Sequence, residues 1–368
     1  MLDVAFIGWR GMVGTTLLER MIASGDFDFI KPTFYISHPN VVVDLPKSLQ
    51  QENIIHSYEL DNLLQHTVIV AMKGSEFTQM MYPKLKQSGW KGYWIDAASH
   101  LRQEEDSCLI LDPINRSSII NHLKNGTKAF IGPNCTTALL LLALAGLIQE
   151  DLIEWVSTMT YQAISGAGSK AVDDFFEQMR LIGDHHSNAL SQIDHAHRLL
   201  ATASYSNTIA ANVMPWIDSD LGNGISKEEA KCQIESEKIL NRPFQVDGMC
   251  VRIGSLRCHS QALTIKLKQH VSVEKLESIL TNGHKFIRFI PNEKSATNQF
   301  LHPLHVSKQL DVFVGRMRYI NEKENLLTLF TVGDQLLWGA SEPLRRMIRL
   351  IHEHIHQSET LSKCQSKC

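Results

Sequence analysis

The sequence has no excess of charge of one sign. Its 368 residues carry 36 Lys and Arg against 39 Asp and Glu, a formal net charge of −3. Proteins that bind nucleic acid or anionic membranes usually carry a basic excess, so this balance argues against both classes of partner. Hydrophobic residues make up 43% of the chain, which is ordinary for a globular protein long enough to form two domains.

Long hydrophobic runs are also missing. The most apolar stretch, residues 138–148, is too short to span a bilayer and contains Gly146. The first residues, MLDVAFIGWRG, lack the charged segment and cleavage site of a signal peptide. Seven cysteines, an odd number without the spacing of a disulfide framework, are typical of reduced thiols in the cytosol. We expect a cytoplasmic protein that does not bind membranes.

Short apolar runs alternate with helical stretches over the first third of the chain. Strands are predicted at LDVAFIGW, KPTFYIS, HTVIVAM and GYWIDAA, and helices at TTLLERMIASGDF and EFTQMMYPKLKQSGW. This alternation predicts a parallel, doubly wound α/β sheet. Further on, SQALTIKLKQ alternates strictly, with Leu263, Ile265 and Leu267 on one face. A second, α+β domain with a sheet that has one solvated face is therefore expected.

Three glycines follow the first predicted strand and open the first helix. They are Gly8, Gly11 and Gly14 in FIGWRGMVG, and glycines there let backbone amides approach a pyrophosphate at the positive end of a helix. The spacing is G-x-x-G-x-x-G rather than the usual dinucleotide pattern, and a tight strand-to-helix turn is the alternative interpretation. The flanking strand and helix favour a phosphate-binding loop.

Two features favour NADP over NAD as the dinucleotide. Arg10 lies inside the glycine loop, where a guanidinium can pair with an additional phosphate. The end of the second strand has Ser37 and His38 and no acidic residue, so the carboxylate that binds the ribose 2′-hydroxyl in NAD enzymes is missing.

A cysteine stands between a turn and an apolar run in GPNCTTALLLLALAGLI. A single cysteine in such a place is often a small buried hydrophobe. Cys135, however, follows the turn at Gly132 and Pro133 and falls in the first turn of the predicted helix. Helix dipole and unpaired amides at that position stabilise a thiolate, so Cys135 is a candidate nucleophile that needs an acid or base.

Histidines are plentiful, with 17 in the chain. They are densest in DHHSNALSQIDHAHR, residues 184–198, but this stretch lacks a clear pair of ligands at i and i+4 as zinc helices have. A solvated helix face is the preferred interpretation, and no metal is expected. His259 differs because it enters a strand with Arg252 and Arg257 just upstream. It is either a structural histidine or part of a site for an anion, and its neighbour Cys258 is expected to be buried packing.

The chain resembles the bacterial aspartate-semialdehyde dehydrogenases of the Gram-negative type. The resemblance rests on FIGWRGMVG, GYWIDAASHLR, IGPNCTTALL, YQAISGAGS, MPWID, VRIGSLRCHSQALTIKLK and FTVGDQLLWGASEPLRRM, which occur in this order nearly from end to end. It implies a Rossmann-type, doubly wound NADP-binding domain at 1–133 plus 340–368 and an α+β catalytic and dimerisation domain at 134–339. It also implies a homodimer.

The resemblance further implies an activity and a mechanism. The activity is NADPH-dependent reductive dephosphorylation of L-aspartyl 4-phosphate to the semialdehyde, in lysine, methionine and threonine biosynthesis. The Cys135 thiolate attacks the acyl phosphate with help from His259, phosphate leaves, and hydride reduces the thioester. His259 then takes the thiohemiacetal proton as the aldehyde is released.

The resemblance also assigns residues to each role. Catalysis falls to Cys135, His259 and Gln162, substrate binding to Arg252, Glu228 and Gln162, and phosphate binding to Arg102, Asn134 and Lys231. Together with the residues singled out above, the expected cofactor positions are Gly8, Arg10, Gly11, Met12, Val13, Gly14, Ser37, His38, Lys73, Ser165, Gly166, Ala167, Gly168, Ser169 and Gln335.

This sequence departs from the family pattern at three places. Lys73 stands where the family commonly has glutamine, Ser37 and His38 replace a commoner serine–threonine pair, and residues 185–213 form a shorter segment.

Three other functions compete with the one above. A reductase of another acyl phosphate is disfavoured by Arg252 and Glu228, which suit a free amino acid. A non-catalytic NADP-binding paralogue would lack the cysteine or histidine, and a cysteine hydrolase would not need the glycine loop.

Overall fold

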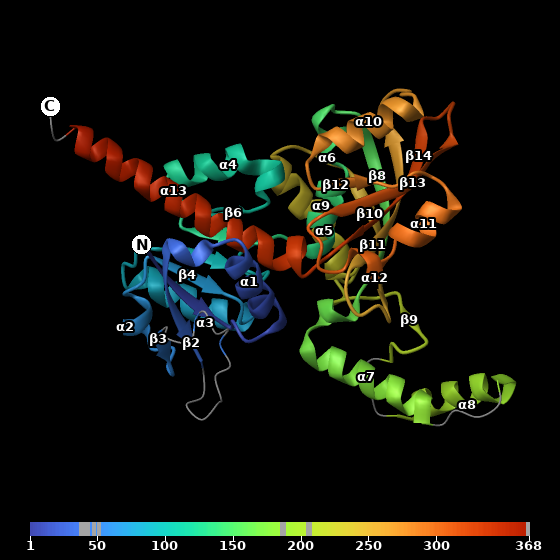
Figure 1. Cartoon of the computed structure of the whole chain (residues 1–368), viewed down its shortest axis with the longest axis horizontal. Helices are drawn as coiled ribbons and strands as arrows, with labels where there is room; N and C mark the ends of the chain where they lie inside the picture. Colours follow the sequence, from blue (N-terminus) through green and yellow to red (C-terminus); the bar gives the residue numbers. More distant parts are fainter. Residues whose placement is uncertain (37–44, 46–48, 50–52, 185–188, 204–207, 366–368) are drawn as a thin grey trace. The chain divides into compact units, whose positions relative to one another are not determined.

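The computed structural model of the chain describes residues 1–36, 45, 49, 53–184, 189–203 and 208–365 (Figure 1). The chain forms two compact units. The first comprises Met1–Ala138, Glu237–Arg242 and Leu336–Cys368, and the second comprises Leu139–Ser236 and Pro243–Gln335.

The first unit contains a seven-stranded sheet in the order β3-β2-β1-β4-β5-β7-β6. All neighbouring strands in it are parallel, which confirms the predicted doubly wound sheet. The strands are β1 (Leu2–Ile7), β2 (Ile30–Tyr35), β3 (Asn53–Ile55), β4 (Val68–Ala71), β5 (Tyr93–Asp96), β6 (Ser107–Leu109) and β7 (Ala129–Ile131).

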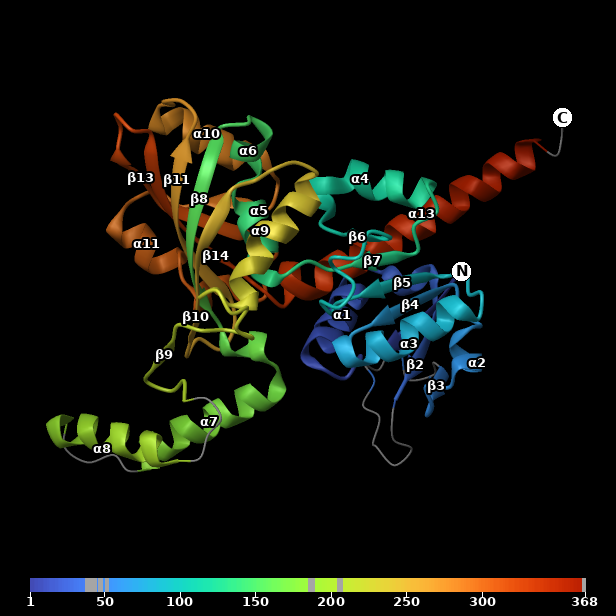
Figure 2. The same cartoon turned by 180° about the vertical axis from the view of Figure 1, so that it is seen from behind.

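Helices cover both faces of this sheet. Figures 1 and 2 view it from opposite sides, with α13 (Glu342–Gln365) in front in one view and α3 (Ser75–Gln87) in front in the other. The remaining helices are α1 (Met12–Ala23), α2 (Leu60–Leu63) and α4 (Asp112–Lys124), with short helical turns at Asp26–Asp28 and Leu337–Ser341. Because helices lie on both faces, the strands are buried on both sides, as continuous apolar runs require.

The second unit contains a mixed seven-stranded sheet in the order β12-β13-β14-β11-β8-β10-β9. The strands are β8 (Ile153–Gln162), β9 (Val213–Met214), β10 (Val246–Ile253), β11 (His259–Leu267), β12 (Ile287–Phe289), β13 (Val312–Asn321) and β14 (Leu326–Gly333). The helices are α5 (Cys135–Ala143), which starts in the first unit, α6 (Ala145–Gln149), α7 (Ser169–Asp184), α8 (Ala189–Thr202), α9 (Lys227–Leu240), which ends in the first unit, α10 (Val273–Gly283), α11 (Lys294–Phe300) and α12 (Pro303–Val306).

The expected alternation along β11 is confirmed. Leu263, Ile265 and Leu267 are at most 1% exposed, and the side chains between them are only partly buried. On that second face of the sheet, Met159 of β8 pairs with Met249 of β10, and they are 37% and 57% exposed. The sheet therefore has one face in the core and one open face that carries apolar side chains.

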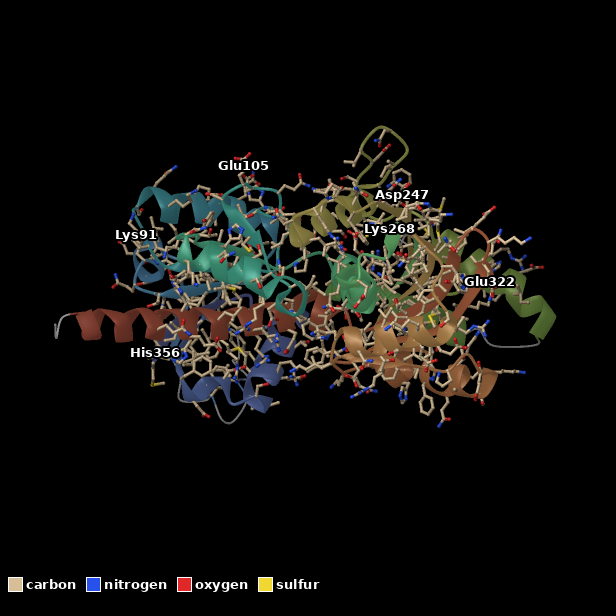
Figure 3. All side chains as sticks on the ribbon, turned by 90° about the horizontal axis from the view of Figure 1, so that it is seen from above. Lys91, Glu105, Asp247, Lys268, Glu322 and His356 are labelled. Atoms are coloured by element: carbon tan, nitrogen blue, oxygen red, sulfur yellow. The ribbon has the colours of Figure 1, made fainter. Side chains whose placement is uncertain are left out.

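Charged side chains project from the surface of both units. Figure 3 labels Lys91 and Glu105 in the first unit and Asp247 and Glu322 in the second, and all four are exposed. None of the helices in the described part of the chain has the length and apolar character needed to cross a membrane. The described residues also contain no group of three or more His, Cys, Asp or Glu side chains arranged to hold a metal ion.

Candidate active site

Cys135 is the first residue of α5, as predicted. The carboxamide oxygen of Asn134 caps this helix, accepting hydrogen bonds from the amides of Thr136 at 2.9 Å and Thr137 at 3.3 Å. Cys135 itself is partly exposed, whereas residues 138–142 behind it are at most 1% exposed. The apolar run therefore anchors the helix, and the sulfur-bearing residue stays accessible at its positive end.

Arg102 is anchored beside the turn that leads to Cys135. Its Nε donates to the carbonyl oxygen of Gly132 at 2.9 Å, and its Nη2 donates to that of Ala97 at 3.3 Å. The arginine is only 8% exposed, so its charge is held within the fold next to the cysteine turn. That placement suits binding of a phosphate group.

Lys238, near the end of α9, holds the loop of Arg102. Its ammonium donates to the carbonyl oxygens of Arg102 at 2.8 Å and Glu104 at 2.7 Å, and to Ser107 Oγ at 3.1 Å. Three acceptors on one loop restrain its backbone. Lys238 was not predicted to be functional, because a lysine at a helix end is usually a surface residue.

The glycine loop has the geometry expected of a dinucleotide-binding turn. Gly8 has φ of +77°, and a Cβ there would lie 2.5 Å from the carbonyl oxygen of Met72. A Cβ on Gly14 would lie 2.3 Å from the backbone of Trp9. Gly11 precedes α1, is exposed, and no side chain caps that helix. The first amides of α1 thus face an open loop, which fits a pyrophosphate group.

Four more expected cofactor residues of the first unit lie in its described part. Arg10 is exposed, and Met12 and Val13 are partly buried. Lys73 follows β4, and its ammonium lies 4.0 Å from the centre of the Tyr58 ring, a cation–π contact that holds the side chain. Ser37 and His38 lie outside the described residues.

His259 is buried in the second unit at the start of β11, with 1% of its surface exposed. Its Nδ1 accepts a hydrogen bond of 3.0 Å from the backbone N–H of Ala163. An Nδ1 that accepts cannot carry a proton, so the neutral ring carries its proton on Nε2. The contact thus selects one tautomer, in which Nε2 is a hydrogen-bond donor.

Burial first, and then the positive charge of Arg252, lower the pKa of His259 to about 3, although the charge of Glu228 and a backbone hydrogen bond at Cys258 oppose the shift. The Ala163 amide acts in the same direction as burial, because a protonated Nδ1 would meet another N–H group. The imidazole is therefore neutral across the physiological pH range.

Arg252 and His259 share the Ala163 peptide. The guanidinium Nη1 of Arg252 donates to the Ala163 carbonyl oxygen at 2.7 Å, while the N–H of the same residue binds His259. Gly166 lies against both side chains, since a Cβ there would be 2.9 Å from Arg252 Nη1 and 3.2 Å from His259 Cε1. Glycine at this position therefore allows the backbone to lie close to both functional groups, where a larger residue would collide with Arg252.

Glu228 and Lys231 are directly paired on the first turns of α9. The Lys231 ammonium donates to Glu228 Oε2 at 2.9 Å and to Asp218 Oδ2 at 2.7 Å. Burial lowers the pKa of Lys231, but the charges and hydrogen bonds of the two carboxylates outweigh burial and raise it overall. Asp218 belongs to the MPWID motif and was not expected to take part. Glu229 instead caps α9, exchanging hydrogen bonds with Ser226.

The remaining predicted residues of the second unit surround the turn that follows β8. Gln162 is 1% exposed and donates to Thr160 Oγ1 at 3.3 Å. In the Ser165–Ser169 loop, Ser165 is buried, while Gly166, Ala167 and Ser169 are exposed. Gln335 is buried and donates to Ser165 Oγ at 2.6 Å.

Each unit thus brings part of the predicted site together. In the first unit Arg102 is hydrogen-bonded to the turn that carries Cys135. In the second unit Arg252 and His259 converge on Ala163, and Glu228 joins Lys231. The backbone of Ala163 has no chemical signature in the sequence, and only the fold reveals its role.

Comparison with known proteins identifies the class. The family model described as "Semialdehyde dehydrogenase, NAD binding domain" matches residues 3–122, and "Semialdehyde dehydrogenase, dimerisation domain" matches residues 144–338. The chain therefore belongs to the semialdehyde dehydrogenase family, a class of oxidoreductase with one cofactor-binding and one dimerisation domain.

Several solved structures of aspartate-semialdehyde dehydrogenases are similar to this chain. Aspartate-semialdehyde dehydrogenase from Francisella tularensis is 42% identical, with a TM-score of 0.90 over 96% of this chain and 100% of that one. A Vibrio cholerae aspartate-semialdehyde dehydrogenase II in complex with ASA, 23% identical with a TM-score of 0.77, matches over 96% of this chain and 98% of that one. The Candida albicans enzyme with NADP, at 16% identity and a TM-score of 0.65 over 94% and 96%, has the same fold. The expected relationship to aspartate-semialdehyde dehydrogenases is confirmed.

Proposed function

We propose that this protein catalyses the NADPH-dependent reductive dephosphorylation of L-aspartyl 4-phosphate to L-aspartate 4-semialdehyde. The observation that carries the proposal is the partly exposed Cys135 at the first position of a helix that is otherwise buried. A nucleophilic thiolate needs that combination of access and a positive helix end. Membership of the family, and the 42% identical Francisella tularensis enzyme, support the choice of substrate.

In the first half of the proposed reaction, the Cys135 thiolate attacks the acyl carbon and phosphate leaves, so that a thioester forms. Arg102, fixed on the Gly132 and Ala97 carbonyls, and Lys231 bind the phosphate group, whose two negative charges require positive partners. Asn134 contributes by orienting Cys135, because its side-chain oxygen caps α5.

In the second half, the bound nicotinamide cofactor supplies the hydride that reduces the thioester. His259 stabilises the charge that develops on the carbonyl oxygen, donating a hydrogen bond from Nε2 while Ala163 occupies Nδ1. The aldehyde is released as the thiolate of Cys135 forms again. Gln162 orients the acyl group. The proton-accepting part of the role implied for His259 requires the opposite tautomer and stays a prediction.

The amino-acid part of the substrate is assigned to Arg252 and Glu228. A guanidinium binds an α-carboxylate through two parallel hydrogen bonds, and Arg252 is fixed by its 2.7 Å bond to Ala163. Glu228, 6% exposed, supplies a negative charge for an α-amino group. These two charges favour a free amino acid over an acylated one.

The cofactor is proposed to be NADP. The exposed Arg10 in the glycine loop can pair with the additional phosphate of NADP, and the Candida albicans relative was solved with NADP. The residues that the resemblance assigns to cofactor binding are the glycine loop, Arg10, Met12, Val13, Ser37, His38, Lys73, the Ser165–Ser169 loop and Gln335.

We infer that a second copy of the chain covers the open face of the second sheet. Met159 and Tyr161 of β8 and Met249 of β10 are 37%, 38% and 57% exposed there. Such an apolar patch is characteristic of an interface. A dimerisation-domain model spans this unit, and a homodimer follows as the proposed assembly.

The activity is tested in the reverse direction. Purified protein is given L-aspartate 4-semialdehyde, phosphate and either NADP or NAD. We expect it to reduce NADP faster than NAD. The measurement is absorbance at 340 nm, where only the reduced cofactor absorbs. Omission of phosphate is expected to stop the reaction, because the thioester then has no acceptor. Reduction that continues at full rate without phosphate would contradict an acyl phosphate as the product.

Replacing Arg252 is expected to weaken substrate binding. In Arg252→Leu, kcat/KM for the semialdehyde is expected to fall. The expected decrease corresponds to a loss of about 2–5 kcal/mol in transition-state binding, the usual effect of removing one partner of a buried charge pair. Arg288→Leu is the matched control, because Arg288 is 58% exposed and forms a surface pair with Asp311 that contributes little. An unchanged KM and kcat in Arg252→Leu would mean that another residue holds the α-carboxylate.

A further inference from the structure

The residue before His259 has a backbone conformation that L-amino acids rarely adopt. Cys258 has φ of +71° although it is not glycine, and its side chain is completely buried. Non-glycine residues remain in this region only where their surroundings hold them there, and they cluster at functional sites. The strained peptide determines the direction in which the next side chain leaves the backbone, so the contacts that hold Cys258 also orient His259.

Gln335 supplies that contact. Its carboxamide oxygen accepts a 2.7 Å hydrogen bond from the backbone N–H of Cys258, and only 2% of Gln335 is exposed. A buried backbone amide that loses its acceptor is costly. The hydrogen bond therefore stabilises the left-handed conformation of Cys258 relative to alternatives that would turn the amide elsewhere.

The other end of the same side chain holds the turn after β8. Gln335 Nε2 donates to Ser165 Oγ at 2.6 Å, and that hydroxyl donates to the carbonyl oxygen of Leu256 at 2.5 Å. The direction of each bond is determined, because the glutamine oxygen faces an N–H group and its NH2 faces a hydroxyl that already has an acceptor. Gln335 thus ties residues 256 and 258 to residue 165.

These two segments are the ones that meet at the imidazole. Ala163, two residues before Ser165, donates its backbone N–H to His259 Nδ1 at 3.0 Å. Gly166 is one residue after Ser165, and a Cβ at this position would lie 3.2 Å from His259 Cε1. Glycine thus allows the turn to lie close to the imidazole. The Ala163–His259 hydrogen bond therefore depends on the two segments keeping their separation, which the Gln335 side chain spans.

We propose that Gln335 is a positioning residue for His259. One amide atom holds the strained Cys258 peptide and the other holds the Ser165 turn, and together they keep the imidazole on the Ala163 amide with its proton on Nε2. This role differs from the cofactor contact that resemblance assigns to Gln335. It rests on the proposed function only in that His259 acts on the substrate.

The experiment compares three variants of the full-length protein. Gln335→Leu removes both hydrogen bonds, whereas Gln335→Glu keeps an acceptor for the Cys258 amide and loses the donor to Ser165. Gln178→Leu is the matched control, because Gln178 is also buried and its oxygen accepts from the amides of Ile209 and Ala210, which belong to neither of the two segments joined by Gln335. Turnover of semialdehyde, phosphate and NADP, NADP affinity and the ¹⁵N spectrum of labelled histidines are measured for each.

In Gln335→Leu we expect kcat at saturating substrates to fall about 100-fold, the size of effect that follows from a small misplacement of a catalytic group, with unchanged NADP affinity. The ¹⁵N signals of His259, assigned by their loss in His259→Gln, are expected to leave the pure Nε2–H pattern. Gln335→Glu is expected to recover part of kcat and of that pattern, and Gln178→Leu to keep both.

A different result would overturn the proposal. If Gln335→Leu or Gln335→Glu weakens NADP binding but keeps kcat at saturating NADP and the His259 signals, Gln335 serves the cofactor and does not position His259. If the unaltered protein has no turnover, the proposed function fails, while the histidine spectra still decide whether Gln335 sets the tautomer. Because Gln335→Glu keeps the acceptor, it tests the proposal even if Gln335→Leu does not fold.

Discussion

In Cys135→Ala, reduction of NADP by semialdehyde and phosphate is expected to fall to background, a loss on the order of 10⁶-fold, as seen when other enzymes lose their nucleophile. Without the thiolate no thioester forms, and no other group of the proposed mechanism can form a covalent bond to the substrate. NADP affinity is expected to stay the same, because the glycine loop follows β1 and makes no use of the sulfur. Rates are measured at 340 nm, where the reduced cofactor absorbs, and affinity by cofactor fluorescence.

Cys108→Ala is the matched control for that variant. Cys108 lies in β6 of the same unit, is 3% exposed, and burial raises the pKa of its thiol to about 12. Its removal is expected to leave turnover intact and to lower stability by about 1 kcal/mol, as loss of a small buried side chain does. If Cys135→Ala still turns over semialdehyde while it binds NADP normally, the thioester mechanism is wrong.

The fold could be predicted because its elements have strong periodic signals. Apolar runs separated by helical stretches predicted the parallel sheet of the first unit, and the strict alternation at 263–267 predicted which face of β11 is buried. Both signals come from the spacing of side chains along a strand or helix, which a single sequence contains.

For individual side chains, the position in the fold could be predicted better than the contacts. The position of Cys135 in the first turn of a helix was predicted from the turn residues before it, and the structure confirms it. Asn134 was expected to bind phosphate. Its oxygen also caps α5, a role that the sequence Asn-Cys-Thr-Thr allows, since asparagine is a preferred N-cap residue.

Contacts that involve the backbone could not be predicted. The Ala163 peptide binds both His259 and Arg252, yet an alanine carries no sign of such a role. The positive φ of Cys258 is stabilised by Gln335, which lies 77 residues further along the chain. Asp218 likewise pairs with Lys231, which lies 13 residues further along the chain. Tertiary structure decides which residues meet, so a motif that identifies the participants does not identify their partners.

His259→Ala is expected to lower kcat by about 10²–10⁴-fold, the usual contribution of a positioned proton donor or acceptor. NADP affinity is expected to be unchanged. His56→Gln is the control, because His56 is exposed and its replacement is expected to affect neither quantity.

His259→Gln separates two roles for the imidazole. A glutamine amide can still donate a hydrogen bond to the carbonyl oxygen but cannot accept a proton, so partial activity in His259→Gln indicates the donor role that the Ala163 contact favours.

The pH dependence provides an independent test of the same residue. Burial, and then Arg252, lower the pKa of His259 to about 3, so the ring stays neutral down to pH values far below the ordinary range of histidine, about 6.5. The kcat profile of the unaltered protein between pH 5 and 9 is therefore expected to show no step that disappears in His259→Gln. Between about pH 6.5 and 3 the unfolded chain binds a proton at this position and the folded chain does not, so stability decreases as the pH falls through this window. His259→Gln is expected to unfold less steeply with acid there, measured by thermal unfolding at several pH values. A kinetic step near pH 6.5 that is lost in His259→Gln would instead mean that the imidazole is protonated during the reaction, and that the Ala163 amide does not hold its tautomer.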